Sequence, residues 1–152
     1  MVNLEREFVM IKPDGVKRRL IGEIISRLEH KGLRIIAMKM LLVSKEAAQK
    51  HYAVHKGKPF FEGLIKFISS GPVVAMIVEG NDAIKHVRKL IGSTNPLEAE
   101  IGSIRGEYSI EIGRNIIHGA DSPENSKYEY SIYFKESEIV TNEMTDEKWI
   151  YE

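Results

Sequence analysis

Short runs of branched apolar residues divide the chain into predicted strands. Such runs occupy residues 6–13, 33–43 and 72–80, and each is bounded by glycine, proline or polar residues. Segments of this length and composition are typical of buried β-strands. Residues 108–117 have a similar apolar content and predict a fourth strand.

Between these runs, the apolar positions follow the spacing of helices. One stripe predicts a helix that ends near Gly32 and follows a turn at Asp14 and Gly15; its members are Val16, Leu20, Ile21, Ile24, Ile25 and Leu28. Further helices are predicted at 45–52, 60–68 and 82–90. The last helix is predicted to begin at Ser122, because serine can cap a helix and Pro123 suits its first position.

The order of these elements favours an α+β fold. It is strand, helix, strand, helices, strand, helix, strand, helix, with no internal repeat and no low-complexity linker. This order predicts a ferredoxin-like sandwich in which helices cover a four-stranded antiparallel sheet. A doubly wound parallel sheet is the alternative that the pattern leaves open. With 43% apolar residues, residues 1–152 are long enough to form one domain with a single core.

Composition narrows the possible classes of function. The 22 basic and 22 acidic side chains balance, so no overall positive field would attract nucleic acid or an anionic membrane. The absence of cysteine removes disulfides, thiolate metal sites and cysteine nucleophiles, and favours an intracellular protein. No apolar run approaches the ~18 residues of a membrane span, and the start resembles no signal peptide. We therefore expect a cytoplasmic protein that binds neither membrane nor nucleic acid.

Two candidate sites are weak. Gly57 and Lys58 resemble the end of a P-loop, but Tyr52 stands where its first glycine belongs, and the sequence has no GxGxxG. His51 and His55 are spaced by one helical turn, as in zinc proteases, but Tyr52 replaces the glutamate that would act as general base. We therefore favour a solvated helix face with Tyr52 against the core.

His118 is the stronger candidate for a reactive group. Gly119 leaves space beside its imidazole, and the helix predicted from Ser122 offers free backbone N–H groups that suit an anion. Asn115 lies three residues before it, so the two side chains can act together only if the strand has ended or twisted there. Glu129, two turns into the helix, could fix the tautomer of the imidazole.

Cations that could hold phosphates are scattered along the chain at Lys12, Arg88 and Arg105. Their spacing does not show that they converge.

Six separated stretches resemble the nucleoside diphosphate kinase family. They are FVMIKPDGV, HYAVHKGKPFFEGL, SGPVVAM, STNP, GSIRG and NIIHGADS, which span nearly the entire chain in order. The resemblance implies transfer of the γ-phosphoryl group of ATP to a nucleoside diphosphate by a ping-pong mechanism, with phosphohistidine at His118. It also implies that Mg²⁺ enters with the nucleotide and has no protein ligand. The alternative is an inactive family member that binds nucleotides or serves as an oligomeric interaction protein.

The resemblance also assigns roles to individual residues. His118 matches the catalytic histidine, Glu129 the carboxylate that orients it, and Tyr52 the neighbouring tyrosine. Lys12 is implied to contact both the sugar and the transferring phosphoryl group. The implied nucleotide-binding residues are Lys12 and Asn115 for the sugar, His55, Arg88, Thr94 and Arg105 for the phosphates, and Phe60 and Ile112 for the base.

Three positions depart from the family pattern, and the tail adds a prediction. Ala120 stands where serine is usual, Val54 replaces a frequently acidic residue, and Lys58 replaces a common arginine. We expect them to alter the rate or pH dependence but not to abolish activity. Trp149 and its neighbours make the tail 135–152 apolar, which predicts a subunit contact in a hexamer of the kind found in the family, where some bacterial members are tetramers.

Overall fold

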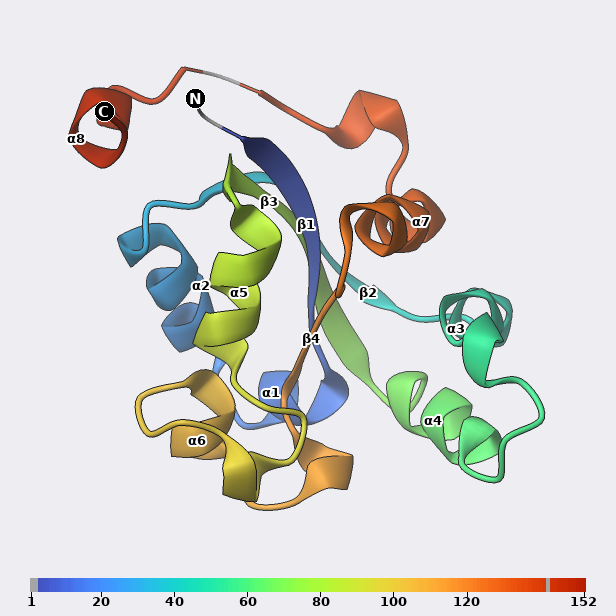
Figure 1. The fold of residues 1–152 in the computed structure, drawn as a ribbon. Coiled ribbons are helices and arrows are strands. Elements are labelled where there is room, and N and C mark those ends of the chain that lie inside the picture. The colour runs from blue at the N-terminus through green and yellow to red at the C-terminus, as the bar shows by residue number, and fades with distance from the viewer. Residues whose placement is uncertain (1–2, 142) are drawn as a thin grey trace.

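The computed structural model describes residues 3–141 and 143–152 (Figure 1). In this part of the chain four strands form one sheet in the order β2-β3-β1-β4, and every neighbouring pair is antiparallel. The strands are β1 (Leu4–Ile11), β2 (Arg34–Leu42), β3 (Pro72–Asn81) and β4 (Ile117–Gly119). This topology confirms the predicted α+β fold and is not the doubly wound parallel sheet.

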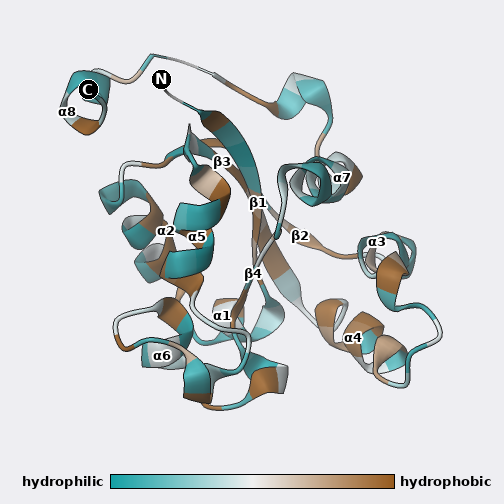
Figure 2. Ribbon diagram, in the orientation of Figure 1, coloured by the Kyte–Doolittle hydropathy of each residue, from teal (hydrophilic) through white to brown (hydrophobic). Residues whose placement is uncertain are grey.

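Helices cover both faces of the sheet, because the central strands are apolar on both sides. In β1, Phe8 and Met10 face one core, whereas Val9 and Ile11 face the other. The first core is covered by α3 (Lys45–His51), α4 (Phe61–Ile68) and α7 (Pro123–Tyr133). The second is covered by α2 (Ile21–His30) and α5 (Ala83–Ile91). Figure 2 shows broad hydrophilic bands on α5, as expected for a helix that buries only one side.

Shorter elements connect these layers. They are the helices α1 (Pro13–Lys17), α6 (Ile104–Tyr108) and α8 (Glu147–Ile150) and the 3₁₀ turns η1 (Ala53–His55), η2 (Pro96–Glu98), η3 (Ile112–Arg114) and η4 (Glu136–Glu138).

The first helical region differs from its prediction. The turn expected at Asp14 and Gly15 is part of α1, and the single stripe expected from Val16 is divided between α1 and α2. Proline favours the first turn of a helix, and Pro13 begins α1 in this way. Arg19 then has a left-handed φ of 60°, which interrupts the helical path before α2.

The strand predicted at 108–117 was wrong. Tyr108 ends α6, which Ser103 caps by accepting a hydrogen bond from Gly106 N, and only residues from Ile117 onward pair with β1. Ile116 has a left-handed φ of 74°, so the chain turns there. Its N–H donates to Asp14 Oδ2 and its carbonyl accepts from Lys12 N, which satisfies the backbone without a strand partner.

The C-terminal tail packs partly on its own chain. The Ile150 side chain lies against Gly32, where an added Cβ would come within 3.0 Å of it, and the Tyr151 hydroxyl accepts a hydrogen bond from Asn81 N at 3.3 Å. The Trp149 side chain is 82% exposed, so the predicted subunit contact stays a prediction. Among the described residues, no helix has the length and apolar character needed to span a bilayer.

Candidate active site

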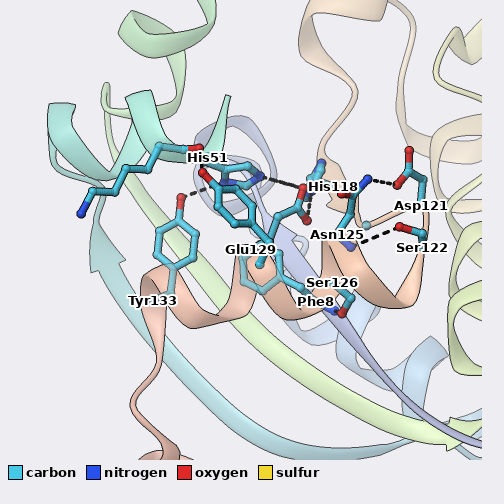
Figure 3. Close-up of polar contacts among 12 residues, drawn as sticks. Phe8, His51, His118, Asp121, Ser122, Asn125, Ser126, Glu129 and Tyr133 are labelled. Carbon is cyan, nitrogen blue, oxygen red and sulfur yellow. Dashed lines mark hydrogen bonds and ion pairs between the residues drawn. The ribbon is translucent and has the colours of Figure 1, made fainter. Parts of the chain in front are cut away.

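Strand β4 and helix α7 position the two central residues of the site. His118 is the middle residue of β4 and pairs with Met10 of β1. Ser122 caps α7 by accepting a hydrogen bond from Asn125 N at 3.1 Å, and Pro123 is the first helical residue, so this predicted helix start is confirmed. Glu129 lies two turns into α7 and points back toward β4 (Figure 3).

A carboxylate joins two imidazoles at the centre of the site. Glu129 Oε2 lies 2.9 Å from His118 Nε2, and Glu129 Oε1 lies 3.4 Å from Nε2 of His51 (Figure 3). The Tyr133 hydroxyl lies 2.8 Å from the other ring nitrogen of His51, Nδ1. The contact between His118 and Glu129 that the sequence suggested is therefore present, and it belongs to a longer chain of polar groups.

One proton arrangement gives Glu129 a donor at both oxygens. His118 and His51 each carry their proton on Nε2 and donate to the carboxylate, and Tyr133 donates to Nδ1 of His51. The described residues provide no hydrogen-bond partner for Nδ1 of His118. The lone pair on this nitrogen is therefore available to react.

Burial and hydrogen bonding set the charges in this network. Burial by itself would raise the pKa of Glu129, but the hydrogen bonds from His118 and His51 lower it to about 2, so the residue is a carboxylate. Burial lowers the pKa of His118 below its usual 6.5, and the hydrogen bond to Glu129 opposes part of this shift. His118 is therefore neutral near pH 7, as a nucleophile must be.

His51 is a site residue that the sequence interpretation missed. It is 5% exposed, not part of a solvated face, and it ends α3, whereas His55 lies in η1 outside that helix. The available signal was the spacing of Ala48 and His51, which are the two buried residues of α3. The Tyr52 ring stacks on the His51 ring at 4.6 Å, and burial raises the Tyr52 pKa to about 12, so the hydroxyl stays protonated.

Lys12, Asn115 and Thr94 meet at the end of β1. Lys12 Nζ donates to Asn115 Oδ1, and Asn115 Nδ2 donates to the Thr94 carbonyl at 3.0 Å. Burial lowers the pKa of Lys12 to about 8, with the nearby Arg105 charge adding to the shift. Because Asn115 precedes the turn at Ile116, it can share one region with His118, which satisfies the condition set by the sequence.

The two arginines bond backbone carbonyls around the same strand. Arg105 is 7% exposed and donates to the carbonyls of Gly92, Asn115 and Ile117. Arg88 donates to the Gly119 carbonyl at 3.1 Å, beside His118. Sequence spacing did not show this convergence. Through these hydrogen bonds Arg105 fixes the backbone on either side of Ile116, next to His118.

The predicted base-binding residues lie farther out. The Phe60 side chain is 51% exposed and lines an open pocket of about 590 Å³ with Phe67 and Arg114. The His55 ring lies 5.3 Å from the Phe60 ring. Ile112, 59% exposed, precedes Gly113 of the same pocket.

The three positions that depart from the family pattern have different environments. Ala120 is 1% exposed and its N–H donates to the Phe8 carbonyl. Val54 is 79% exposed, and Lys58 Nζ lies 3.2 Å from Nδ1 of His55. Their effects on rate stay predictions.

Comparisons with known proteins identify a family. Residues 5–139 match the family model described as nucleoside diphosphate kinase. Nucleoside diphosphate kinases of Archaeoglobus fulgidus and Carboxydothermus hydrogenoformans are 57% and 54% identical over 149 residues, which cover 98% of this chain and 99% and 100% of those proteins. The structure of the Halobacterium salinarum nucleoside diphosphate kinase in complex with CDP superposes with a TM-score of 0.94 at 47% identity, covering 97% of this chain and 99% of that one.

Proposed function

Because this chain belongs to the nucleoside diphosphate kinase family, we propose that it transfers the γ-phosphoryl group of ATP to a nucleoside diphosphate through phosphohistidine at His118. The observation that carries this assignment is the geometry of His118. Its Nε2 lies 2.9 Å from Glu129 Oε2, while Nδ1 has no hydrogen-bond partner among the described residues.

The transfer proceeds in two steps. The Nδ1 lone pair of His118 forms a bond to the γ-phosphorus, the bond to the bridging oxygen breaks, and the diphosphate leaves with that electron pair. A terminal oxygen of the second diphosphate then attacks the phosphorus, and the lone pair returns to Nδ1. Glu129 stabilises the positive charge that develops on the imidazole, because it already accepts the Nε2 proton. These steps give ping-pong kinetics.

The surrounding side chains bind the nucleotide. Lys12 contacts the sugar and the moving phosphoryl group with Asn115, and its charge already acts on His118. Arg88, Thr94, Arg105 and His55 hold the phosphates, and Tyr52 holds the His51 ring beside His118. The base stacks on Phe60 with Ile112 on its other side. Aromatic stacking tolerates every base, so base selectivity is low.

Mg²⁺ enters as part of the nucleotide substrate. The one group of three metal-ligand side chains among the described residues is His51, His118 and Glu129. Mg²⁺ prefers six oxygen ligands in octahedral geometry, and two imidazoles do not suit it. As the family resemblance implies, the phosphates of the nucleotide hold the ion, and its charge adds to that of the basic side chains.

We assign the molecule a hexameric assembly of one domain, residues 1–152, in the cytoplasm. The tail 135–152 makes a subunit contact in this assembly. Support comes from the exposed Trp149 and from Leu97 and Ile101, which are 88% and 100% exposed on the loop before α6. Large contiguous patches of exposed apolar side chains are typical of protein interfaces.

Phosphoryl labelling tests the assignment. The purified protein is incubated with γ-labelled ATP and Mg²⁺, and we expect acid-labile, alkali-stable label that GDP removes as labelled GTP. The His118→Gln variant should take up no label, whereas His30→Gln, at the exposed end of α2, should behave as the wild type. Label uptake and release that persist in His118→Gln would refute the proposal. Nucleotide binding without exchange in the wild type would favour the inactive alternative.

A further inference from the structure

Three side chains with metal-ligand chemistry converge beside β4. We propose that Nε2 of His51, Nε2 of His118 and the Glu129 carboxylate form a binding site for Zn²⁺, and that the bound ion blocks phosphorylation of His118. The binding part stands on geometry alone, and the blocking part rests on the function proposed above.

The distance between the two imidazole nitrogens suits a tetrahedral ion, and the Glu129 carboxylate lies within reach of both. With Zn–N and Zn–O bonds of about 2.0–2.1 Å, neighbouring ligands of a tetrahedral site lie about 3.3–3.5 Å apart. The two Nε2 atoms are 3.3 Å apart, His51 Nε2 lies 3.4 Å from Glu129 Oε1, and His118 Nε2 lies 2.9 Å from Glu129 Oε2. The two histidines contact different oxygens of Glu129, and one oxygen with the two Nε2 atoms forms a set whose members lie within 4.8 Å of one another. To admit the ion, the carboxylate must therefore rotate so that one oxygen lies about 3.3–3.5 Å from both Nε2 atoms.

The chemistry of this set of ligands favours zinc. Two histidines with one glutamate make a three-ligand zinc site that leaves the fourth position for water. Imidazole suits Zn²⁺ better than Mg²⁺, and the Glu129 anion offsets part of the positive charge of the ion. The His118 side chain is 24% exposed, so water can reach the open position, whereas the 1% exposed side chain of His51 closes the inner side.

Neighbouring groups already support one of the ligands. Metal-bound histidines usually donate their second N–H to an outer partner, and His51 Nδ1 has the Tyr133 hydroxyl at 2.8 Å. The Phe8 ring lies edge-on to the His51 ring at 5.7 Å and stacks on the Tyr133 ring at 5.2 Å. These contacts fix the orientation of the His51 ring before any ion binds (Figure 3).

Zinc would change the position of two protons without releasing any. In the proton arrangement that gives Glu129 a donor at both oxygens, both imidazoles carry their proton on Nε2. A metal at Nε2 requires that proton to move through solvent to Nδ1, where His51 then donates to Tyr133 and His118 carries an N–H. Because phosphorylation needs the lone pair on Nδ1 of His118, the ion disables the nucleophile as well as occupying space beside it.

A metal titration of the full-length protein tests the binding. Protein stripped with a chelator and free of nucleotide is titrated with Co²⁺, and Zn²⁺ then displaces it. We expect one ion per chain, the intense visible absorption of tetrahedral Co²⁺, and loss of that absorption on addition of Zn²⁺. The His51→Gln variant should bind at least ~10–100-fold more weakly, the range typical even for loss of an outer-shell partner, while His30→Gln should bind as the wild type. Binding that is equal in His51→Gln and wild type, or absent from both, would overturn the proposal.

Three further measurements distinguish effects on folding and on function from effects on zinc binding. Tyr133→Phe keeps every ligand and should weaken zinc by ~10-fold, so it tests the site even if His51→Gln fails to fold. Nitrogen NMR should show the His118 proton move from Nε2 to Nδ1 when Zn²⁺ binds. Phosphoryl uptake from γ-labelled ATP, measured after excess zinc is removed, should be lost in the zinc-loaded protein. Zinc binding with unchanged uptake would overturn the blocking part, whereas no uptake in the zinc-free protein would instead overturn the proposed function.

Discussion

Two buried glutamates on the two sides of β1 have opposite charge states. Glu129, on α7, has an imidazole at each carboxylate oxygen, and its pKa is lowered to about 2. Glu7, in β1, is fully buried, and neither of its oxygens has a hydrogen-bond partner among the described residues. Its Oε2 lies 3.7 Å from the place that a Cβ at Gly119 would take, on the side of α5.

The charge states of Glu7 and Glu129 therefore depend more on their hydrogen-bond partners than on how deeply each side chain is buried. Burial raises the pKa of Glu7 to about 9, and the negative charge of Glu129 adds to the shift. Glu7 is a neutral acid near pH 7, whereas Glu129 is an anion that two donors stabilise. The charged residue, Glu129, contacts His118 in the site. The uncharged residue, Glu7, lies on the opposite face of the sheet, next to Gly119 of β4.

The largest expected effect comes from Glu129→Gln. A glutamine oxygen accepts from one imidazole only, so the tautomer of the other is no longer fixed, and we expect kcat/KM to fall by about 100-fold or more. Loss of the anion also lowers the His118 pKa further, so the acidic limb of the pH profile should move to lower pH. Steady-state kinetics measured across a range of pH give both the fall in kcat/KM and the shift of the acidic limb. An unchanged kcat/KM would show that Glu129, like Glu7, does not contribute to catalysis.

Glu7→Gln should change stability but not activity. In the native protein the pKa is raised from 4.5 to about 9, so the folded state binds more protons between these values, and stability falls as pH rises through that window. The slope approaches about 1.4 kcal/mol per pH unit. The variant should lose this slope in urea unfolding across the same window. Equal slopes in both proteins would mean that Glu7 is charged when folded.

For Glu129 the pH dependence has the opposite sign. Its pKa is lowered from 4.5 to about 2, so its contribution to stability is present above pH 4.5 and is lost as pH falls toward 2. The Glu129→Gln variant should therefore remove part of the acid-induced loss of stability, which the same unfolding experiment measures.

A partly buried cation, Lys12, provides a third case. Lys12 has a partner in Asn115, but burial still lowers its pKa to about 8. We expect kcat/KM to fall about tenfold per pH unit above pH 8 as the charge that binds phosphate is lost. Because bound phosphates favour the charged form, kcat at saturating nucleotide should fall at higher pH than kcat/KM does. If kcat and kcat/KM fell at the same pH, the assignment of this alkaline limb to Lys12 would be contradicted.

The smallest effect is expected at the start of α7, which carries Glu129. Ser122→Ala removes the side-chain cap and should destabilise the protein by about 1 kcal/mol without changing the pH profile of activity. Ser131→Ala, on the exposed side of the same helix, is the matched control and should stay within about 0.5 kcal/mol of wild type. A shifted profile in Ser122→Ala would link the cap to the Glu129 geometry.

The sequence by itself determined the elements whose signals are local. Strand composition predicted β1, β2 and β3, and Ser122 with Pro123 predicted the start of α7. The fold class and the family also followed from the chain, because the order of elements and the separated motifs are properties of the sequence. The pairing of His118 with Glu129 followed from the family resemblance and from the position of Glu129 two turns into the predicted helix, although His118 lies within β4 and does not follow the strand predicted at 108–117.

Tertiary structure decided what depends on residues distant in sequence. Ile116 adopts a left-handed backbone because Asp14 and Lys12 bind its polar groups, and no pattern within 108–117 records those partners. His51 was taken for a surface residue, and it is buried because Tyr133, Phe8 and Glu129 surround it. The opposite charges of Glu7 and Glu129 have the same origin. Burial and hydrogen bonding act between distant segments, so a side chain acquires its ionisation and tautomer only when the fold supplies its neighbours.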